Sequence, residues 1–142
     1  MKLEHILQRP IVTIPSGTTM LDAAKLMVDN NMGLLVICDT KEGTKLLGVI
    51  SERDIMKAIA SGKTLNTAVD EVSTKHVITA KASSDVAEAA KAMNKNRIRH
   101  VVVVDEHGKP IGVVSMRDLV GERATLTAIL QSNEKEVFIG GD

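Results

Sequence analysis

The sequence predicts an α/β (α+β) fold of two β-α-β-β-α repeats related by a pseudo-twofold axis, with their sheets packed together and their helices outside. Residues 11–39 align without a gap on residues 77–105, and eight of the 29 paired positions are identical. An eight-residue motif, GVISERDI at 48–55, recurs as GVVSMRDL at 112–119 with five identities. Each copy also alternates short β-branched runs with helical patterns of apolar residues. Because one unit of about 60 residues buries little surface alone, the two copies should cover each other's sheets.

The first repeat is interpreted as a strand, a helix, a β-hairpin and a closing helix. Thr19-x-x-Asp22 is typical of a helix start, because a hydroxyl can cap the first turn and an acid suits the helix N-terminus. Asn30 and Asn31 are typical of a helix end. Gly43 lies in the expected hairpin turn. The expected strands are Ile11–Ile14, Leu34–Cys38 and Leu46–Ile50, and the closing helix is Glu52–Ala60.

The second repeat carries the same signals at matching positions. Asp85-x-x-Glu88 predicts the helix start, Asn96 and Arg97 predict its end, and Gly108 lies in the hairpin turn. The expected elements are the strands Val77–Ala80, Val101–Val104 and Ile111–Val114, and a closing helix at Met116–Leu130. We expect the repeats to span residues 1–62 and 63–124, followed by the helix end and a tail at 125–142.

The composition restricts the class of protein. Hydrophobic residues make up 44% of the chain, but Phe138 is the one aromatic residue, so the core must be aliphatic. Eighteen basic residues balance eighteen acidic residues, which argues against nucleic acid as the main partner. No apolar run approaches the roughly 18 residues that span a membrane, and no secretory leader pattern opens the sequence. We therefore expect a cytoplasmic protein.

The repeated motif places a serine, an arginine and an aspartate where a strand passes into a helix. The structural interpretation is a capping box, in which Ser51 caps a backbone N–H and Asp54 reaches back. The functional interpretation is a ligand site, because backbone N–H groups, a hydroxyl and a guanidinium at a helix start suit a phosphate. Arg53 and Arg117 favour a ligand, since a cation in the first helical turn is unfavourable with the helix dipole. The aspartate suits the two hydroxyls of a ribose.

Two such units, each ending in Gly-apolar-apolar-Ser-x-Arg-Asp, resemble a tandem pair of cystathionine-beta-synthase (CBS) domains, a Bateman module of the stand-alone type, over about residues 1–124. The resemblance implies a non-catalytic regulatory module that senses energy or nucleotide state by binding AMP, ADP or ATP between its repeats. It implies no required cofactor and a homodimer, with an unidentified regulated protein as a further partner. The alternatives are a protein-interaction scaffold with empty clefts, or a module that binds S-adenosylmethionine, NAD or nucleic acid.

The resemblance also implies that both repeats build each cleft, with the aspartate on the ribose and the serine near the phosphate. The backbone around Ile14 and Ala80 would meet the adenine edges. Ile50 and Val114 would flank the ring. The cleft that we call the Asp54 cleft would contain Ser51, Arg53, Asp54, Thr79, Ala80, Arg99 and His100. The cleft that we call the Asp118 cleft would contain Ser115, Arg117, Asp118, Thr13, Ile14, Gly33 and Leu34.

The two clefts are expected to be chemically unequal. Arg99 and His100 would give the Asp54 cleft a positive wall, where the other cleft has Gly33 and Leu34. An arginine binds phosphate oxygens bidentately, and a histidine adds a donor as it protonates near pH 6–7. We therefore expect phosphate-bearing ligands to bind more tightly in the Asp54 cleft.

Other reactive residue types show no site pattern. Cys38 lies in a run that is expected to be buried, so it is interpreted as a core residue rather than a nucleophile. The four histidines lack the spacing of metal ligands. The homodimer is expected through the closing helices, whose apolar residues exceed what a thin core can use: Ile55, Ile59, Leu119, Leu126 and Leu130.

Overall fold

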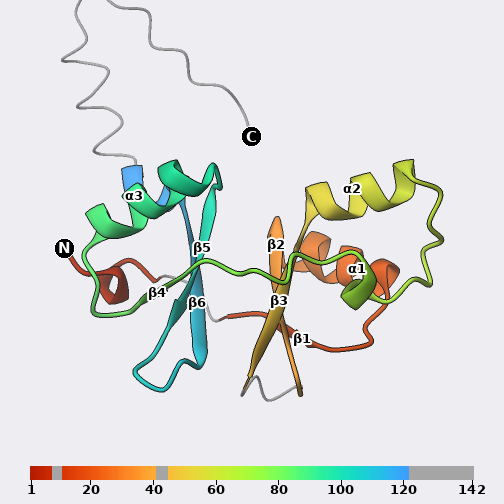
Figure 1. The fold of residues 1–142 in the computed structure, drawn as a ribbon, viewed down its shortest axis with the longest axis horizontal. Coiled ribbons are helices and arrows are strands. Elements are labelled where there is room, and N and C mark those ends of the chain that lie inside the picture. The colour runs from red at the N-terminus through yellow and green to blue at the C-terminus, as the bar shows by residue number, and fades with distance from the viewer. Residues whose placement is uncertain (8–10, 41–44, 122–142) are drawn as a thin grey trace, which may run out of the picture.

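The computed structural model describes residues 1–7, 11–40 and 45–121, and it confirms the expected fold class. Two three-stranded sheets stand next to each other at the centre of the molecule, and the helices lie on their outer sides (Figure 1). The first repeat contains β1 (Thr13–Pro15), α1 (Met20–Asn30), β2 (Leu34–Cys38), β3 (Leu46–Ser51) and α2 (Glu52–Ala60). The second repeat contains β4 (Thr79–Lys81), α3 (Val86–Asn96), β5 (His100–Val104) and β6 (Pro110–Ser115).

Both sheets have the same strand order and the same register. The outer strands β1 and β4 run parallel to the central strands β2 and β5, and the hairpin strands β3 and β6 run antiparallel to them. Thr13 pairs with Val36, and Thr79 pairs with Val102. β1 and β4 begin two residues later than predicted, because the chain before each contributes only one backbone hydrogen bond to the neighbouring strand.

The residues that the sequence marks as helix caps occupy the ends of the helices. Thr19 Oγ1 accepts a hydrogen bond from the backbone N–H three residues later at 3.1 Å. The Asp85 carboxylate accepts one from the N–H of Ala87 at 2.9 Å. Asn31 and Arg97 follow the two helices with φ values of 51° and 53°. Such left-handed backbone ends a helix, and asparagine adopts it more readily than most residues.

Residues 116–121 continue from β6 as a helix, at the predicted start of the closing helix. Gly121, the last described residue of this helix, has a left-handed φ of +63°. The rest of the predicted helix, including Leu126 and Leu130, and the tail lie outside the described residues. Of the helices that the structure describes, none is both long and apolar enough to cross a membrane.

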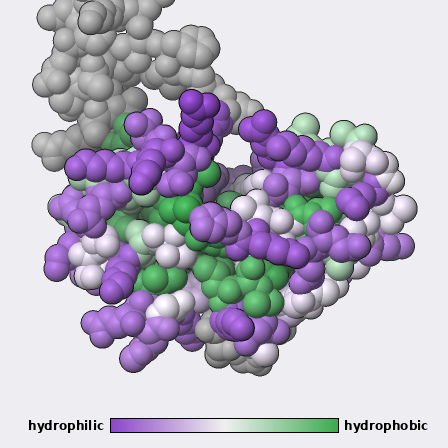
Figure 2. All heavy atoms as spheres, in the orientation of Figure 1, coloured by the Kyte–Doolittle hydropathy of each residue, from purple (hydrophilic) through white to green (hydrophobic). Residues whose placement is uncertain are grey.

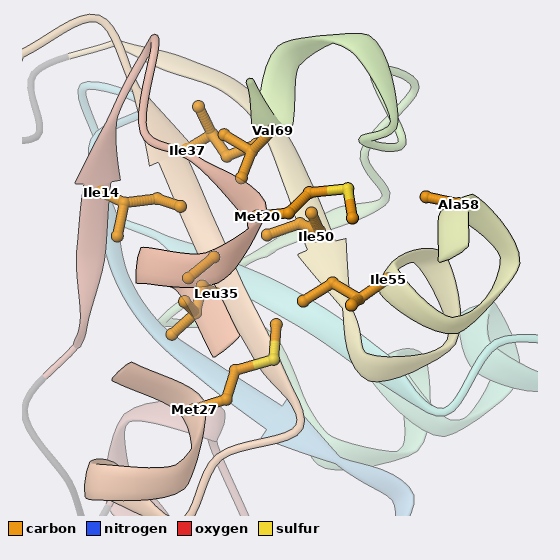
Figure 3. Close-up of a cluster of buried hydrophobic side chains, with 10 residues drawn as sticks. Ile14, Met20, Met27, Leu35, Ile37, Ile50, Ile55, Ala58 and Val69 are labelled. Atoms are coloured by element: carbon orange, nitrogen blue, oxygen red, sulfur yellow. The ribbon is translucent and has the colours of Figure 1, made fainter. Parts of the chain in front are cut away.

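Alternate residues of the strands supply three apolar clusters, because successive side chains of a strand point to opposite faces. In the first repeat, the outward set packs under α1 and α2, with Leu35, Ile37 and Ile50 among its members (Figure 3). The second repeat has the twin of this cluster on the helix side of its own sheet. The inward faces pack against each other through a third cluster, which includes Val36 from the first repeat and Val102 from the second. We call this third group the inter-sheet cluster.

Each repeat is completed by a short segment that precedes the other repeat in the chain. Residues 1–7 lead into the first repeat but pack on the second, where Leu3 is fully buried. Residues 68–74 lead into the second repeat but pack on the first, where Val69 is fully buried beneath the helices (Figure 3). We call these two stretches the lead segments. Their exchange means that neither repeat has a complete core of its own.

Hydrogen bonds hold each lead segment at the turn between the first strand and the first helix of the repeat that it completes. Leu3 and Val69 donate their backbone N–H groups to carbonyls of that turn at 2.9 and 2.7 Å. Asp70 adds two bonds, because its carboxylate accepts from the Ser16 hydroxyl at 2.5 Å and from the Gly17 N–H at 2.7 Å. The hydrogen bond from the Ser16 side chain is the main reason why the pKa of Asp70 is lowered.

The exchange explains the glycine that opens the repeated motif. A Cβ atom on Gly48 would lie 2.8 Å from the backbone oxygen of Thr74, in the lead segment that crosses there. A Cβ atom on Gly112 would lie 2.7 Å from Cδ2 of Leu7, at the far end of a flexible side chain. Both distances are shorter than a real Cβ contact, so packing requires glycine at position 48, where fixed backbone is met, whereas at position 112 a flexible side chain is met.

We predict that Gly48→Ala destabilises the protein more than Gly112→Ala. The new methyl group at position 48 meets fixed backbone, and overpacking of this kind costs about 1–3 kcal/mol, whereas the side chain of Leu7 can turn away. Urea unfolding of the two variants measures the change in the free energy of unfolding. Equal losses in the two variants would contradict this account of the crossing segments.

Candidate functional site

The repeated serine and aspartate form a complete capping box in each repeat. The backbone N–H of Ser51 donates to Asp54 Oδ2 at 2.9 Å, and the N–H of Asp54 donates to Ser51 Oγ at 3.1 Å. The same two bonds join Ser115 and Asp118 at 2.8 and 3.1 Å. The structural interpretation of the motif is therefore confirmed. In both boxes the aspartate accepts the serine N–H with Oδ2, and its other carboxylate oxygen, Oδ1, takes no part in the box.

Strand register turns both boxes toward the gap between the two sheets. Ser51 pairs with Leu34, which packs on the inter-sheet cluster. Ser115 pairs with His100, which lies two residues before Val102 of the same cluster and therefore on the same face. The two serines thus belong to the inward faces of different repeats.

The threonines of the outer strands lie on the same inward faces. Thr13 and Thr79 pair with Val36 and Val102, and paired residues of neighbouring strands share a face. Serines and threonines from both repeats therefore lie on the inward faces of the two sheets. Figure 2 shows a notch between hydrophilic side chains where the upper ends of the two repeats meet.

His100 is linked electrostatically to both sides of the gap. Burial lowers the pKa of His100 below its ordinary value, and the positive charge of Arg99 lowers it further. Asp118 of the same repeat and Glu52 of the other repeat oppose this shift. Burial therefore shifts the pKa of His100 in the direction that disfavours the protonated ring.

The arginines expected near the clefts are exposed. Arg53, Arg99 and Arg117 reach solvent, and none of them forms an ion pair within residues 1–7, 11–40 and 45–121. Over the same residues, the one ion pair joins the N-terminal amine to Asp85 at 3.5 Å. A guanidinium that is not committed to a carboxylate can bind an anion from solution.

The expected ring contacts of two aliphatic residues are wrong. Ile50 and Val114 are 0% and 1% exposed, and they belong to the clusters under the helices. Each precedes a gap-facing serine by one residue, so its side chain points to the opposite face. Ile14 and Ala80 also pack on the helix side, and the expected contact of their backbone with a ligand stays a prediction. Leu34 is an aliphatic residue that does pack at the gap.

Cys38 is fully buried in the inter-sheet cluster, where burial raises the pKa of its thiol. This confirms its interpretation as a core residue, because the reactive form of cysteine is the thiolate. In the part of the chain that the structure describes, no three His, Cys, Asp or Glu side chains are grouped as a metal ion would require.

Glu52 was not among the predicted site residues, but its carboxylate lies over Gly33. A Cβ atom on Gly33 would lie 3.5 Å from Glu52 Cδ, and 3.6 and 3.7 Å from the two carboxylate oxygens. The backbone N–H of Glu52 donates to the carbonyl of Gly33 at 3.0 Å. A signal for this residue was present in the sequence, since the first copy of the motif has Glu52 where the second has Met116.

Two hollows lie beside α2 in the first repeat. The larger, of about 480 Å³, is a mainly apolar groove between α1 and α2 that includes Val28, Met56 and Glu52. Val28 and Met56 are 79% and 69% exposed. The smaller, of about 320 Å³, lies between α2 and a lead segment, next to Asp54 and Lys57.

Comparisons with known proteins cover most of the chain. The family model described as CBS domain matches residues 3–61 and again residues 69–124. The solved structure of a CBS domain protein from Pyrobaculum aerophilum, complexed with AMP, is 34% identical with a TM-score of 0.82, and the match covers 93% of this chain and 100% of that one. The CBS domain pair of protein MJ0100, in complex with 5′-methylthioadenosine and S-adenosyl-L-methionine, is 33% identical with a TM-score of 0.76, over 84% of this chain and 96% of that one.

A curated relative is a much larger enzyme. L-aspartate semialdehyde sulfurtransferase from Methanocaldococcus jannaschii is 35% identical over 117 residues, which are 82% of this chain. The match covers 22% of the enzyme, so the chain corresponds to only a part of it.

We predict that His100 makes the protein less stable as the pH falls below about 6.5. Because burial lowers its pKa in the folded state, the unfolded state binds the proton first, so this stability is complete above the unfolded value and is lost as the pH falls toward the folded value. An NMR titration should give His100 a midpoint below 6.5. His100→Gln should flatten the pH dependence of urea unfolding in this range. A midpoint at or above the ordinary value would show that the carboxylates outweigh burial.

Proposed function

Because the chain belongs to the CBS domain family, we propose that it is a non-catalytic regulatory module that binds adenosine-containing ligands of the AMP, ADP or ATP class in the clefts between its repeats. The proposal is carried by the gap between the sheets, toward which two capping boxes from different repeats turn their serines. The AMP complex of the Pyrobaculum aerophilum protein supports the class of ligand.

In each cleft the aspartate binds the ribose through Oδ1, because the capping box holds Oδ2. Ser51 and Ser115 lie near the phosphate at the start of a helix, where backbone N–H groups and the helix dipole favour an anion. The boxes hold both carboxylates in place before a ligand arrives, which lowers the entropic cost of binding. Arg53 and Arg117 supply further positive charge beside their own boxes.

Each cleft takes its opposite wall from the other repeat. Thr79 and the backbone of Ala80 face the Asp54 box, with Arg99 and His100 toward the phosphate. The Asp118 box is completed by Thr13, Ile14, Gly33 and Leu34. A ligand in either cleft therefore touches both repeats, so binding favours one arrangement of the repeats over others. A change of this kind alters the surface that the module presents to a regulated protein, which makes the module a sensor of energy or nucleotide state.

We also propose a homodimer through the helices. Val28, Met56 and Ile59 are 79%, 69% and 51% exposed on α1 and α2. A second copy related by a twofold axis covers the same groove on both chains. The dimer surface differs from the one expected, because Ile55 is 8% exposed in its own core and Leu119 packs on the core of the second repeat.

We predict that Asp54→Ala and Asp118→Ala each weaken the binding of adenosine in their own cleft. Each variant loses charge-assisted hydrogen bonds to the ribose, which corresponds to about 1–3 kcal/mol. Calorimetry measures the affinities, and a thermal-shift screen of adenine and guanine nucleotides, NAD and S-adenosylmethionine tests the ligand class.

Asp85→Ala is the matched control, since Asp85 also caps a helix. Its backbone pairs with Lys2 of a lead segment, and it belongs to neither cleft. All three variants should lose about 1 kcal/mol of stability with the cap, and only the first two should lose affinity. If both cleft variants bind normally and merely melt earlier, capping is the whole role of the motif. A screen without any binding ligand would favour a scaffold with empty clefts.

We predict that light scattering at micromolar concentration gives about twice the 15.2 kDa mass of the chain. Met56→Glu should shift the protein toward the single-chain mass, because it puts a charge into the apolar groove. Asn66→Glu adds the same charge at an exposed position of the segment after α2 and should leave the mass unchanged. A wild-type mass near that of one chain would rule out the dimer.

A further inference from the structure

The groove between α1 and α2 is mainly apolar and contains a single charge. Among the described residues that line it, Glu52 is the one charged side chain. Its carboxylate lies over Gly33, which belongs to the same groove. Over residues 1–7, 11–40 and 45–121, no ion pair includes Glu52. Water therefore solvates this carboxylate until another molecule covers the groove.

The corresponding surface of the second repeat carries the opposite charge. Met116 takes the place of Glu52, and Arg97 takes the place of Asn31, which lines the groove. Arg97 is exposed at the end of α3, and in the part of the chain that the structure describes it forms no ion pair. The helices of the two repeats lie on opposite outer sides of the molecule (Figure 1). Within one chain, Arg97 therefore cannot neutralise the carboxylate in the groove.

The charge of Glu52 distinguishes two arrangements of a dimer that covers this groove. In a parallel dimer, the first repeats of the two copies face each other, so two Glu52 carboxylates enter one apolar interface. Removing an unpaired charge from water is costly, and like charges across an interface disfavour that arrangement. In an antiparallel dimer, the first repeat of each copy faces the second repeat of the other. This arrangement brings a guanidinium to each carboxylate and avoids both costs.

We infer that the homodimer is antiparallel, with Arg97 of each copy paired with Glu52 in the groove of the other. The inference rests on the homodimer of the proposed function. A contact between two residues occurs twice in a twofold dimer, so the interface contains two such ion pairs. Val120, the counterpart of Met56, is 41% exposed and adds an apolar side chain to the surface that meets the groove.

Neutral variants of the two charged residues test the arrangement. Sedimentation equilibrium of the full chain measures the dissociation constant of the dimer. Glu52→Gln keeps the shape of the side chain, and Arg97→Asn copies the first repeat, where Asn31 has the same left-handed backbone. Each variant should raise the dissociation constant at least about tenfold, because it leaves one charge without its partner in the interface. In a parallel dimer, Glu52→Gln would instead remove a repulsion and lower the dissociation constant.

Exchanging the two charges tests the pair directly. Glu52→Lys and Arg97→Asp should each weaken the dimer, since each places like charges opposite one another. Aspartate suits position 97 because it adopts left-handed backbone more readily than most residues. The double variant restores an ion pair of opposite direction, so its dissociation constant should return to within about threefold of the wild-type value. Recovery of this kind also shows that neither change acts by unfolding the chain.

Glu106→Gln is the matched control, because Glu106 is exposed in the turn between β5 and β6, at the opposite end of β5 from α3. It should leave the dissociation constant unchanged. A dimer that Glu52→Gln or Arg97→Asn leaves unchanged or tightens, or an exchange variant without recovery, overturns the inference and leaves the homodimer standing. A wild-type protein with the mass of one chain overturns the homodimer as well.

Discussion

The crossing of each lead segment over the motif glycine of the opposite repeat is the contact on which the rest of the structure depends. Leu3 and Val69 fill the cores of repeats to which they do not belong in sequence, and both are fully buried. Gly48 must lack a side chain because the backbone of Thr74 passes within 2.8 Å of where a Cβ would be. Each repeat is therefore packed only when the other is present, and their inward faces are held opposite each other.

In the proposed function, the gap between those faces gives the capping boxes a second role. A box at a strand-to-helix junction stabilises the helix wherever it lies, and the bonds of Ser51 and Asp54 show that it does so here. Because the junction is on an inward face, the same residues also present a hydroxyl, a carboxylate oxygen and a helix start to the space between the repeats. In the proposed function stability and ligand binding share these atoms, so a lower melting temperature alone would not identify a binding residue.

Duplication has kept the geometry of the two repeats similar and changed their charge. The hydrogen bonds of the two boxes differ by no more than 0.1 Å, and the bond from the second motif residue to the opposite strand entry is present in both repeats. Glu52 and Gly33 in one repeat stand where Met116 and Arg99 stand in the other. Charge acts over longer distances than packing, so two substitutions can change the local electrostatic potential without altering the scaffold.

The roles of the predicted site residues toward a ligand stay predictions, but their placement follows from register. Leu34, Ser51, His100 and Ser115 share the inward faces because the period of a strand is two residues. The same rule explains the error at Ile50 and its twin, since a shift of one residue moves a side chain to the other face.

The sequence by itself determined the fold class, the order of the elements, the caps and the two boxes. These features depend on residues within a few positions of one another, and the duplication presents each signal twice. Only the tertiary structure decided the exchange of the lead segments, the lowering of the His100 pKa and the place of the Glu52 carboxylate over Gly33. The lead segments are too short for a periodic pattern, and their partners lie more than 60 residues away along the chain. The protonation of His100 depends on burial and on carboxylates from both repeats, which become neighbours only when the two repeats pack together.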